Sequence, residues 1–347
     1  MSTDLSGVSA AILAWYENTA RELPWRVGPH DRAAGVRPDP YHVWLAEIML
    51  QQTTIPHGTR YYIAFLERWP TVSDLAAAQD EDVMAAWAGL GYYARARNLL
   101  KCARIVAARG TFPDTSAELE TLPGIGPYTA GAVAALAFGE RVAAVDGNVE
   151  RVFSRLLALE GDWAKAKLKI RKTVADLVPA DRPAEFAEGL MDLGATVCTP
   201  KTPDCLICPL KEICKAQKRG DADRYPVKRK KKPVPHRTGH VFLLLDRGNL
   251  LLERRPDSGL LGAMLGLPGS EWKEGAAKSK TGAPAEADWI LRGEIRHVFT
   301  HFSLTLQVWQ GHLKGRRPTG EWVPIGEVSG LPSVFAKAFK LIDVSTL

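Results

Sequence analysis

The sequence predicts an α+β protein of two domains, in which an all-helical domain precedes a smaller domain of mixed strands and helix. Three observations support this division. From residue 8 to about residue 178, apolar residues recur at three- and four-residue spacing, most clearly over residues 149–157. A basic, proline-containing stretch with almost no apolar residue follows at 218–236. Beyond it, apolar and polar residues alternate singly, as over residues 304–308, which is typical of half-buried strands.

The linker, a hairpin and a closing helix are each predicted from a local residue pattern. The run Lys228–Lys232 consists only of cations and precedes two prolines, so we interpret it as a solvated tether or as one that also touches phosphates. Residues 241–245 and 250–254 flank Asp246-Arg247-Gly248-Asn249, a predicted hairpin. A closing helix is predicted from Ser333 to Leu341. The predicted boundaries are residues 1–217 for the helical domain, 218–236 for the linker and 237–347 for the second domain.

The length and the net charge of the chain limit the classes of protein to which it can belong. A chain of 347 residues is long enough for two separate cores, and 45 Lys plus Arg against 39 Asp plus Glu give a net charge of +6, which mildly favours a nucleic-acid partner. The N-terminus lacks the basic and apolar regions of a signal peptide, and no apolar run approaches the roughly 18 residues needed to span a bilayer. We expect a monomer with no membrane segment, cytoplasmic and nucleoid-associated in a bacterium or nuclear in a eukaryote.

Four of the five cysteines lie within seventeen positions, with the spacing C-x6-C-x2-C-x5-C. Disulfides would need an oxidising compartment, which nothing in the sequence indicates. Structural zinc usually takes two close pairs of ligands, and only one close pair is present. A 4Fe–4S cluster fits the spacing best, because one close pair with two flanking thiolates suits a bulky cube. The candidate ligands are Cys198, Cys205, Cys208 and Cys214, whereas Cys102 is predicted to be a small core residue.

The segment Leu122–Ala130 carries two glycines, Gly124 and Gly126, directly before Pro127. The glycines permit a tight turn, and a proline suits the first turn of the helix that follows. Free backbone N–H groups at such a helix start can bind a phosphate. The segment therefore favours a helix–hairpin–helix that holds a DNA backbone, with an ordinary interhelical turn as the alternative.

Two carboxylates are candidates for catalysis. Glu47 lies in an apolar helical segment, Tyr41–Thr53, where desolvation raises the pKa of a carboxyl toward the range that a general acid needs. The alternative is a buried glutamate paired with an arginine. Asp146 follows an apolar run and precedes Gly147, which suits a helix N-cap. Such a position also keeps a carboxylate ionised and fixed in place, so capping does not exclude a catalytic role.

The hairpin, the segment around Asp146 and the cysteine quartet, in this order, resemble the endonuclease III superfamily of DNA glycosylases. Leu23–Arg26, the helix around Glu47 with Gln52 and Thr53, and Gly89–Arg95 make the chain similar to the MutY-type adenine DNA glycosylases. The resemblance covers nearly the whole chain. That family flips an adenine mispaired with 8-oxoguanine out of double-stranded DNA and removes it.

The resemblance implies roles for single residues. Glu47 would protonate the departing adenine at N7, and Asp146 would stabilise or trap the oxocarbenium-like sugar. Tyr128 stands where strand-cutting relatives carry a Schiff-base lysine, which implies a monofunctional enzyme that leaves an abasic site. The resemblance also implies that Tyr128 and Asn148 organise the carboxylate pair. It implies that the adenine pocket is lined by Arg21, Trp25 and Asp192. It further implies that Gln52 and Tyr92 wedge into the base stack.

The second domain resembles the MutT-like (Nudix) domain of the same family. Residues 270–288 lack the Arg-Glu-x-x-Glu-Glu cluster that holds magnesium for hydrolysis, so we expect binding without hydrolysis. The loop Phe299, Thr300 and His301 resembles the Phe-Ser-His loop that recognises 8-oxoguanine, with threonine in place of the usual serine. A further departure is the longer connection Val27–Pro38, which is predicted to be a surface loop.

Two rival functions remain. A thymine or general mismatch glycosylase would share the helical core, but an opposite-base reader is needed only when the lesion lies on the other strand. A non-enzymatic iron–sulfur DNA-binding protein would have no use for two carboxylates that face anionic DNA.

Overall fold

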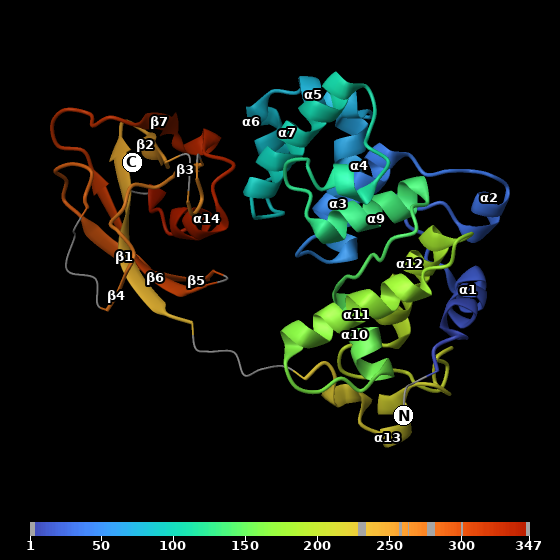
Figure 1. Cartoon of the computed structure of the whole chain (residues 1–347). Helices are drawn as coiled ribbons and strands as arrows, with labels where there is room; N and C mark the ends of the chain where they lie inside the picture. The colour runs from blue at the N-terminus through green and yellow to red at the C-terminus, as the bar shows by residue number, and fades with distance from the viewer. Residues whose placement is uncertain are drawn as a thin grey trace. The chain divides into compact units, whose positions relative to one another are not determined.

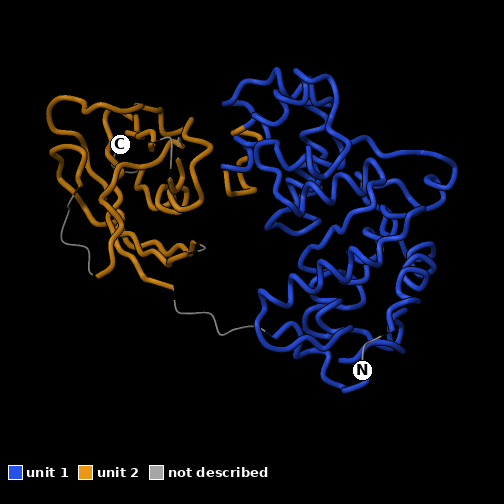
Figure 2. The backbone as a smooth tube through the Cα atoms, in the orientation of Figure 1, with its two compact units in different colours: residues 1–83, 94–230 blue, residues 84–93, 231–347 orange. Residues whose placement is uncertain are grey.

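The computed structural model describes residues 4–227, 234–256, 259–262, 264–275, 282–299 and 301–344. The chain divides into two compact units, residues 1–83 with 94–230 and residues 84–93 with 231–347 (Figure 2). The first unit is helical and the second contains a mixed sheet, which confirms the predicted α+β class (Figure 1). No helix of the described ranges combines the length and the apolar character that crossing a bilayer requires.

The helical unit is organised around α9, which is buried on all its faces from Thr129 to Ala137. These residues are small or aliphatic, so neighbouring helices approach closely. Helix α9 packs against α3 and α12 (Figure 1) and also against α8. The helices, in chain order, are α1 (Val8–Thr19), α2 (Pro29–Ala33), α3 (Pro40–Met49), α4 (Ile55–Arg68), α5 (Val72–Ala77), α6 (Asp80–Ala86), α7 (Ala94–Arg109), α8 (Ser116–Leu119), α9 (Pro127–Phe138), α10 (Gly147–Leu156), α11 (Trp163–Leu177), α12 (Pro183–Asp192), the π-helical turn η1 (Leu193–Val197), α13 (Lys215–Arg219) and the 3-10 turn η2 (Ala222–Arg224).

The predicted linker begins too early. Helix α13 continues to Arg219, and Tyr225 is only 2% exposed in a small apolar cluster with Ala216. The Arg155 Nε also donates to the Tyr225 carbonyl at 3.1 Å. Residues 218–225 therefore belong to the helical unit, because one buried tyrosine anchors a segment whose composition is otherwise polar. The cationic run from Lys228, with Pro233, lies outside the described residues.

The sheet of the second unit has the strand order β3-β2-β1-β6-β5, with β4 paired to β1 and β7 paired to β2. Strands β1 and β6 run parallel, and the other pairs are antiparallel. One face packs on α14 (Ser333–Phe339) through Val334 and Phe335. The strands are β1 (His236–Asp246), β2 (Asn249–Arg254), β3 (Leu265–Gly266), β4 (Lys273–Glu274), β5 (Ile290–Val298), β6 (Ser303–His312) and β7 (Glu321–Pro324), followed by the turn η3 (Ile325–Glu327).

The predicted hairpin and closing helix are confirmed. Arg247 and Gly248 both have positive φ, 49° and 77°, as a two-residue turn between antiparallel strands requires. Helix α14 ends two residues before the predicted Leu341. Strands β5 and β6 are joined by a tight turn, which the Phe299 N–H closes on the Phe302 carbonyl at 2.8 Å. Thr300 lies outside the described residues.

Gly194 of η1 packs against the first turn of α10. A Cβ at this position would lie 2.5 Å from the Asn148 Cβ and 3.0 Å from its Cα, too close for either atom to stay in place. Gly194→Ala should therefore lower the free energy of unfolding by about 1–3 kcal/mol, seen as a lower midpoint of thermal unfolding. Gly147→Ala is the control, because its Cβ would meet nothing within 4 Å. Equal stability of the two variants would contradict this packing.

Candidate active site and metal centre

The two candidate carboxylates lie within electrostatic reach of each other. Glu47 projects from α3 and accepts a hydrogen bond from the Tyr128 hydroxyl at the start of α9. Its side chain keeps some exposed surface, yet protein crowds its carboxyl, and this desolvation raises the pKa of Glu47 to about 7. The Tyr128 hydrogen bond lowers the pKa and the nearby Asp146 charge raises it further. Glu47 thus exchanges a proton near neutral pH.

Asp146 is the N-cap of α10, as its position in the sequence suggested. Its Oδ1 accepts from the Val149 N–H at 2.8 Å, and its Oδ2 accepts from the Asn148 Nδ2 at 2.7 Å. Burial raises the pKa of Asp146, and these hydrogen bonds together with Arg151 oppose the rise. Asp146 has several donors and Glu47 has one, so the two environments favour an ionised aspartate beside a protonatable glutamate.

Arg151 connects this pair to the cysteine loop. Its Nη2 donates to the Asn148 Oδ1 at 2.8 Å and to the Gly194 carbonyl at 2.6 Å. Its Nε donates to the Cys198 carbonyl at 2.8 Å. One guanidinium therefore fixes the side chain that holds Asp146 and the start of the loop that carries the thiols.

A buried ion-pair network lies within electrostatic reach of Glu47. Glu188, only 1% exposed, accepts from the Tyr16 hydroxyl at 2.8 Å and lies 3.9 Å from the Arg26 Nε. Asp192, which the resemblance assigns to the wall of the adenine pocket, is 0% exposed and holds Arg21 and Arg26 at 2.6 and 2.8 Å. It has no exposed surface to offer a ligand, and its carboxylate is held by these two arginines. The charges of Arg26 and Glu188 both act on the pKa of Glu47.

Arg26 and Glu188 were not singled out from the sequence. Arg26 appears in the sequence only as a member of the Leu23–Arg26 motif, and nothing in the sequence of α12 indicates that its Glu188 is buried. The alternative that Glu47 is a structural partner of an arginine is not supported. Within the part of the chain that the structure describes, no Arg or Lys nitrogen lies within 4.0 Å of its carboxylate.

The connection Val27–Pro38 is not simply a surface loop. It contains α2, and Arg32, with a side chain only 9% exposed, reaches into the helical unit. Its Nη2 pairs with the Glu188 Oε1 at 3.2 Å, and its Nη1 donates to the Leu136 carbonyl at 3.3 Å. The prediction failed because the polar composition gave no indication that one of its arginines would neutralise a buried carboxylate.

The residues predicted to touch DNA differ in exposure. Trp25 is mostly buried, with its ring edge-to-face on Tyr62 at 5.2 Å between ring centroids. Gln52 and Tyr92 are exposed, and both have left-handed φ of 61° and 49°, a strained conformation that often marks functional positions.

The hairpin has the geometry that its glycines predict. Gly124 has φ of 79°, and a Cβ there would lie 2.7 Å from the Asn98 Cβ. Gly126 is the exposed N-cap of α9, so the free N–H groups of that helix start are available to a phosphate.

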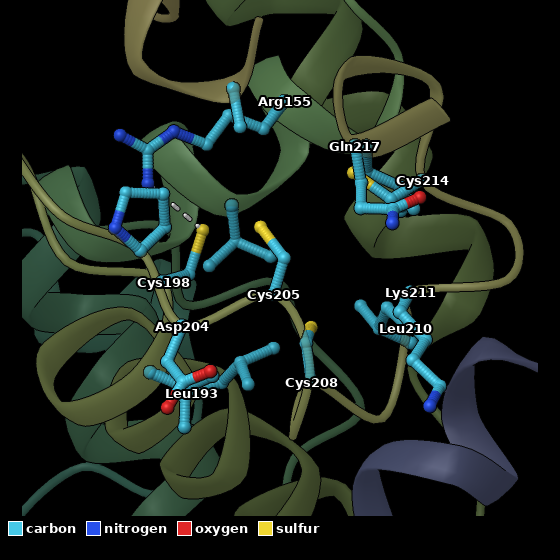
Figure 3. Close-up of a pocket in the computed structure, with 15 residues that line it drawn as sticks. Arg155, Leu193, Cys198, Asp204, Cys205, Cys208, Leu210, Lys211, Cys214 and Gln217 are labelled. Carbon is cyan, nitrogen blue, oxygen red and sulfur yellow. Dashed lines mark hydrogen bonds between the residues drawn. The ribbon is translucent and has the colours of Figure 1, made fainter. Parts of the chain in front are cut away.

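The four cysteines of the quartet line one apolar pocket with an empty volume of about 410 Å³ (Figure 3). The Arg155 Nη1 donates to the Cys198 Sγ at 3.3 Å. Burial raises the pKa of the Cys208 thiol to about 12, so a thiolate there needs a compensating positive charge. Among the described residues, no three His, Cys, Asp or Glu side chains converge closely enough to hold a single metal ion. The fifth cysteine, Cys102, is a buried core residue, as predicted.

In the second unit, the turn after β5 rests on aromatic rings. Phe299 stacks on Trp272 at 5.7 Å between centroids and 27° between planes, and it also packs against Phe302 at 4.8 Å. His301 is exposed. An exposed histidine thus lies next in the chain to closely packed aromatic rings.

Comparison with known proteins supports one family. Residues 45–180 match the model described as HhH-GPD superfamily base excision DNA repair protein, and residues 240–341 match the NUDIX domain. The chain is 33% identical to the adenine DNA glycosylase of Homo sapiens over 91% of this chain and 68% of that protein. The chain belongs to the adenine DNA glycosylase family.

Solved structures support the fold of the helical unit of this family member. A thermostable thymine-DNA glycosylase is 29% identical with a TM-score of 0.53, covering 61% of this chain and 95% of that one. A non-covalent endonuclease III–DNA complex is 25% identical with a TM-score of 0.51, covering 61% and 94%. DNA is the partner that this family membership establishes.

Tyr128→Phe should raise the pKa of Glu47 above about 7, because the lost hydrogen bond stabilises the carboxylate. A hydrogen bond to a charged group is worth about 1.5–3 kcal/mol, so we expect a rise of about one unit or more. The measurement is a ¹³C NMR titration of labelled glutamate side chains. Tyr62→Phe is the control, since the buried Tyr62 hydroxyl has no partner among the described residues. An unshifted Glu47 in Tyr128→Phe would contradict this geometry.

Proposed function

We propose that the protein hydrolyses the N-glycosidic bond of an adenine mispaired with 8-oxoguanine, or with guanine, in double-stranded DNA. It acts as a monomer, after the adenine has been flipped out of the helix. The observation that carries the proposal is the pairing of Glu47, whose pKa is raised to about 7 by burial, with Asp146, which several donors hold beside it.

The carboxyl of Glu47 supplies the proton that the leaving adenine needs at N7. Protonation makes the base a neutral leaving group, and the sugar becomes an oxocarbenium-like cation. The carboxylate of Asp146 stabilises that cation or forms a covalent bond with it. A water molecule then adds at C1′ of the sugar, releases the aspartate from any such bond, and gives its proton to the Glu47 carboxylate. Asn148 and Tyr128 keep the two groups in place, through the hydrogen bonds to Asp146 and Glu47.

The product is an abasic site in an uncut strand. Strand cleavage by relatives of this fold uses a lysine amine that forms a Schiff base with the sugar. A phenol stands at position 128, and burial raises its pKa well above the usual value, so it stays a neutral hydrogen-bond donor.

Reading of the base opposite adenine is assigned to the second unit. The turn that carries Phe299, Thr300 and His301 would contact 8-oxoguanine. The aromatic side chains that pack at this turn support this role, because a fixed turn discriminates between nucleobases better than a mobile one.

A 4Fe–4S cluster is the cofactor we assign to the quartet Cys198, Cys205, Cys208 and Cys214. In a cube each thiolate binds a different iron, so thiols that line one pocket without converging on a single point suit a cluster better than one tetrahedral zinc. When bound, the cluster would brace the loop that Arg151 connects to Asn148.

Glu47→Gln should keep the fold and duplex binding and lower single-turnover base release by about 100- to 10,000-fold, as expected when a general acid is lost. The assay uses duplexes with adenine opposite 8-oxoguanine, guanine or cytosine and thymine opposite guanine, each with and without alkali. Release of thymine instead of adenine would favour the mismatch-glycosylase alternative. Near-normal adenine release by Glu47→Gln would exclude this residue as the acid.

The purified protein should contain about four irons per chain and little zinc. Cys205→Ser should lose most of the iron, whereas Cys102→Ser should retain it because Cys102 lies in the core away from this pocket. Metal analysis of the intact protein measures both. One equivalent of zinc without iron would refute the cluster.

A further inference from the structure

The turn Phe299–Phe302 is flanked by two arginines from different parts of the sheet. The Arg237 guanidinium of β1 lies 4.4 Å from the centroid of the Phe302 ring. The Arg255 guanidinium, just after β2, lies 5.3 Å from the centroid of the Trp272 ring. At one end of the turn, the ring of Phe302 itself carries the Arg237 guanidinium. At the other end, Phe299 stacks on Trp272, whose ring carries the Arg255 guanidinium.

Neither guanidinium is neutralised by a close carboxylate. In the described ranges, no Asp or Glu oxygen lies within 4.0 Å of either arginine. Glu253 acts electrostatically on Arg255 from a greater distance, and the Arg255 Nε donates to the Leu260 carbonyl at 3.2 Å. Most donors of both side chains are therefore left for an anion.

Both arginines line the same open groove, with an empty volume of about 680 Å³. The groove also contains Lys273 and Glu271, which pair with each other at 2.6 Å and cancel. Its net positive charge thus comes from Arg237 and Arg255. The groove is therefore suited to bind an anion, and it lies beside the turn that is proposed to read a base.

We propose that Arg237 and Arg255 bind backbone phosphates of the DNA strand whose base the Phe299–Phe302 turn contacts. The inference rests on the proposed function, because it is that strand which passes this turn. A guanidinium stacked on a ring keeps a fixed plane, and its free edge matches two phosphate oxygens. Contacts of this kind fix the register of a protein on DNA without reading sequence. They would hold the lesion strand so that the turn meets one base.

The test is the salt dependence of binding by the full chain to a duplex with a non-cleavable 2′-fluoroadenosine opposite 8-oxoguanine. Arg237→Gln and Arg255→Gln should each lower the slope of log affinity against log salt by about 1. Each variant should lose affinity by the same factor for a duplex that carries guanine as for a duplex that carries 8-oxoguanine. Base release at saturating enzyme should stay within about two-fold of the unaltered protein, since neither side chain touches the carboxylate pair.

Arg317→Gln is the matched control. Its guanidinium also lies over a ring, 4.7 Å from the Trp322 centroid, but it is paired with Asp246 at 2.6 Å. It should leave the salt slope unchanged. Arg237→Lys and Arg255→Lys keep the charge without the planar fork, so they should retain the slope and lose some affinity.

Two results would overturn the inference. An unchanged salt slope in both Gln variants would mean that the arginines only support the aromatic rings beside the turn. This would hold even if the affinity falls or the variants unfold at a lower temperature. Weakened binding of 8-oxo-dGMP with an unchanged duplex slope would mean that the groove takes a free nucleotide instead. Failure of the proposed function would look different, because the unaltered protein would then release no adenine from any duplex.

Discussion

The site depends on a raised pKa for one carboxyl, that of Glu47, inside a protein that binds an anionic polymer. A shift of the Glu47 pKa from 4.5 to about 7 corresponds to on the order of 3 kcal/mol against its charged form. Desolvation supplies most of it, and the desolvation comes from packing. Helix α9 is built of small residues, so α3 and α12 approach it closely. The raised pKa of Glu47, which lies on α3, therefore follows from the dense packing of the helical unit.

Two networks of polar contacts act on the carboxylate pair. In the first, Arg151 joins Asn148, Gly194 and Cys198, so the capping of Asp146 and the cysteine loop share one guanidinium. In the second, Arg26 and Arg32 neutralise Glu188, and the charges of Arg26 and Glu188 act on Glu47. Removing one member of such a buried pair costs about 3–5 kcal/mol, because the remaining charge has no partner. Through Arg32, the connection Val27–Pro38 contributes to the electrostatic environment of Glu188.

Local patterns predicted much of the fold and the candidate residues for the chemistry. The hairpin glycines, the Asp146 N-cap, the Arg247-Gly248 turn and the cysteine spacing each depend on backbone geometry or ligand number, which a short segment specifies. What the sequence could not reveal depends on contacts between distant segments. The burial of Asp192, the pairing of Glu188 with Arg32 and the anchoring of Tyr225 all join residues more than 60 positions apart, and no local periodicity records them.

The central claim is that Glu47 carries a proton at neutral pH and gives it to the departing base. The most direct measurement is the pH dependence of single-turnover adenine release. Because only the protonated form can act, the rate should be highest below pH 7 and fall as the pH rises through about 7, where Glu47 loses its proton. A rate that stays constant from about pH 6 to pH 9 would contradict the account, since the acid would then lie elsewhere.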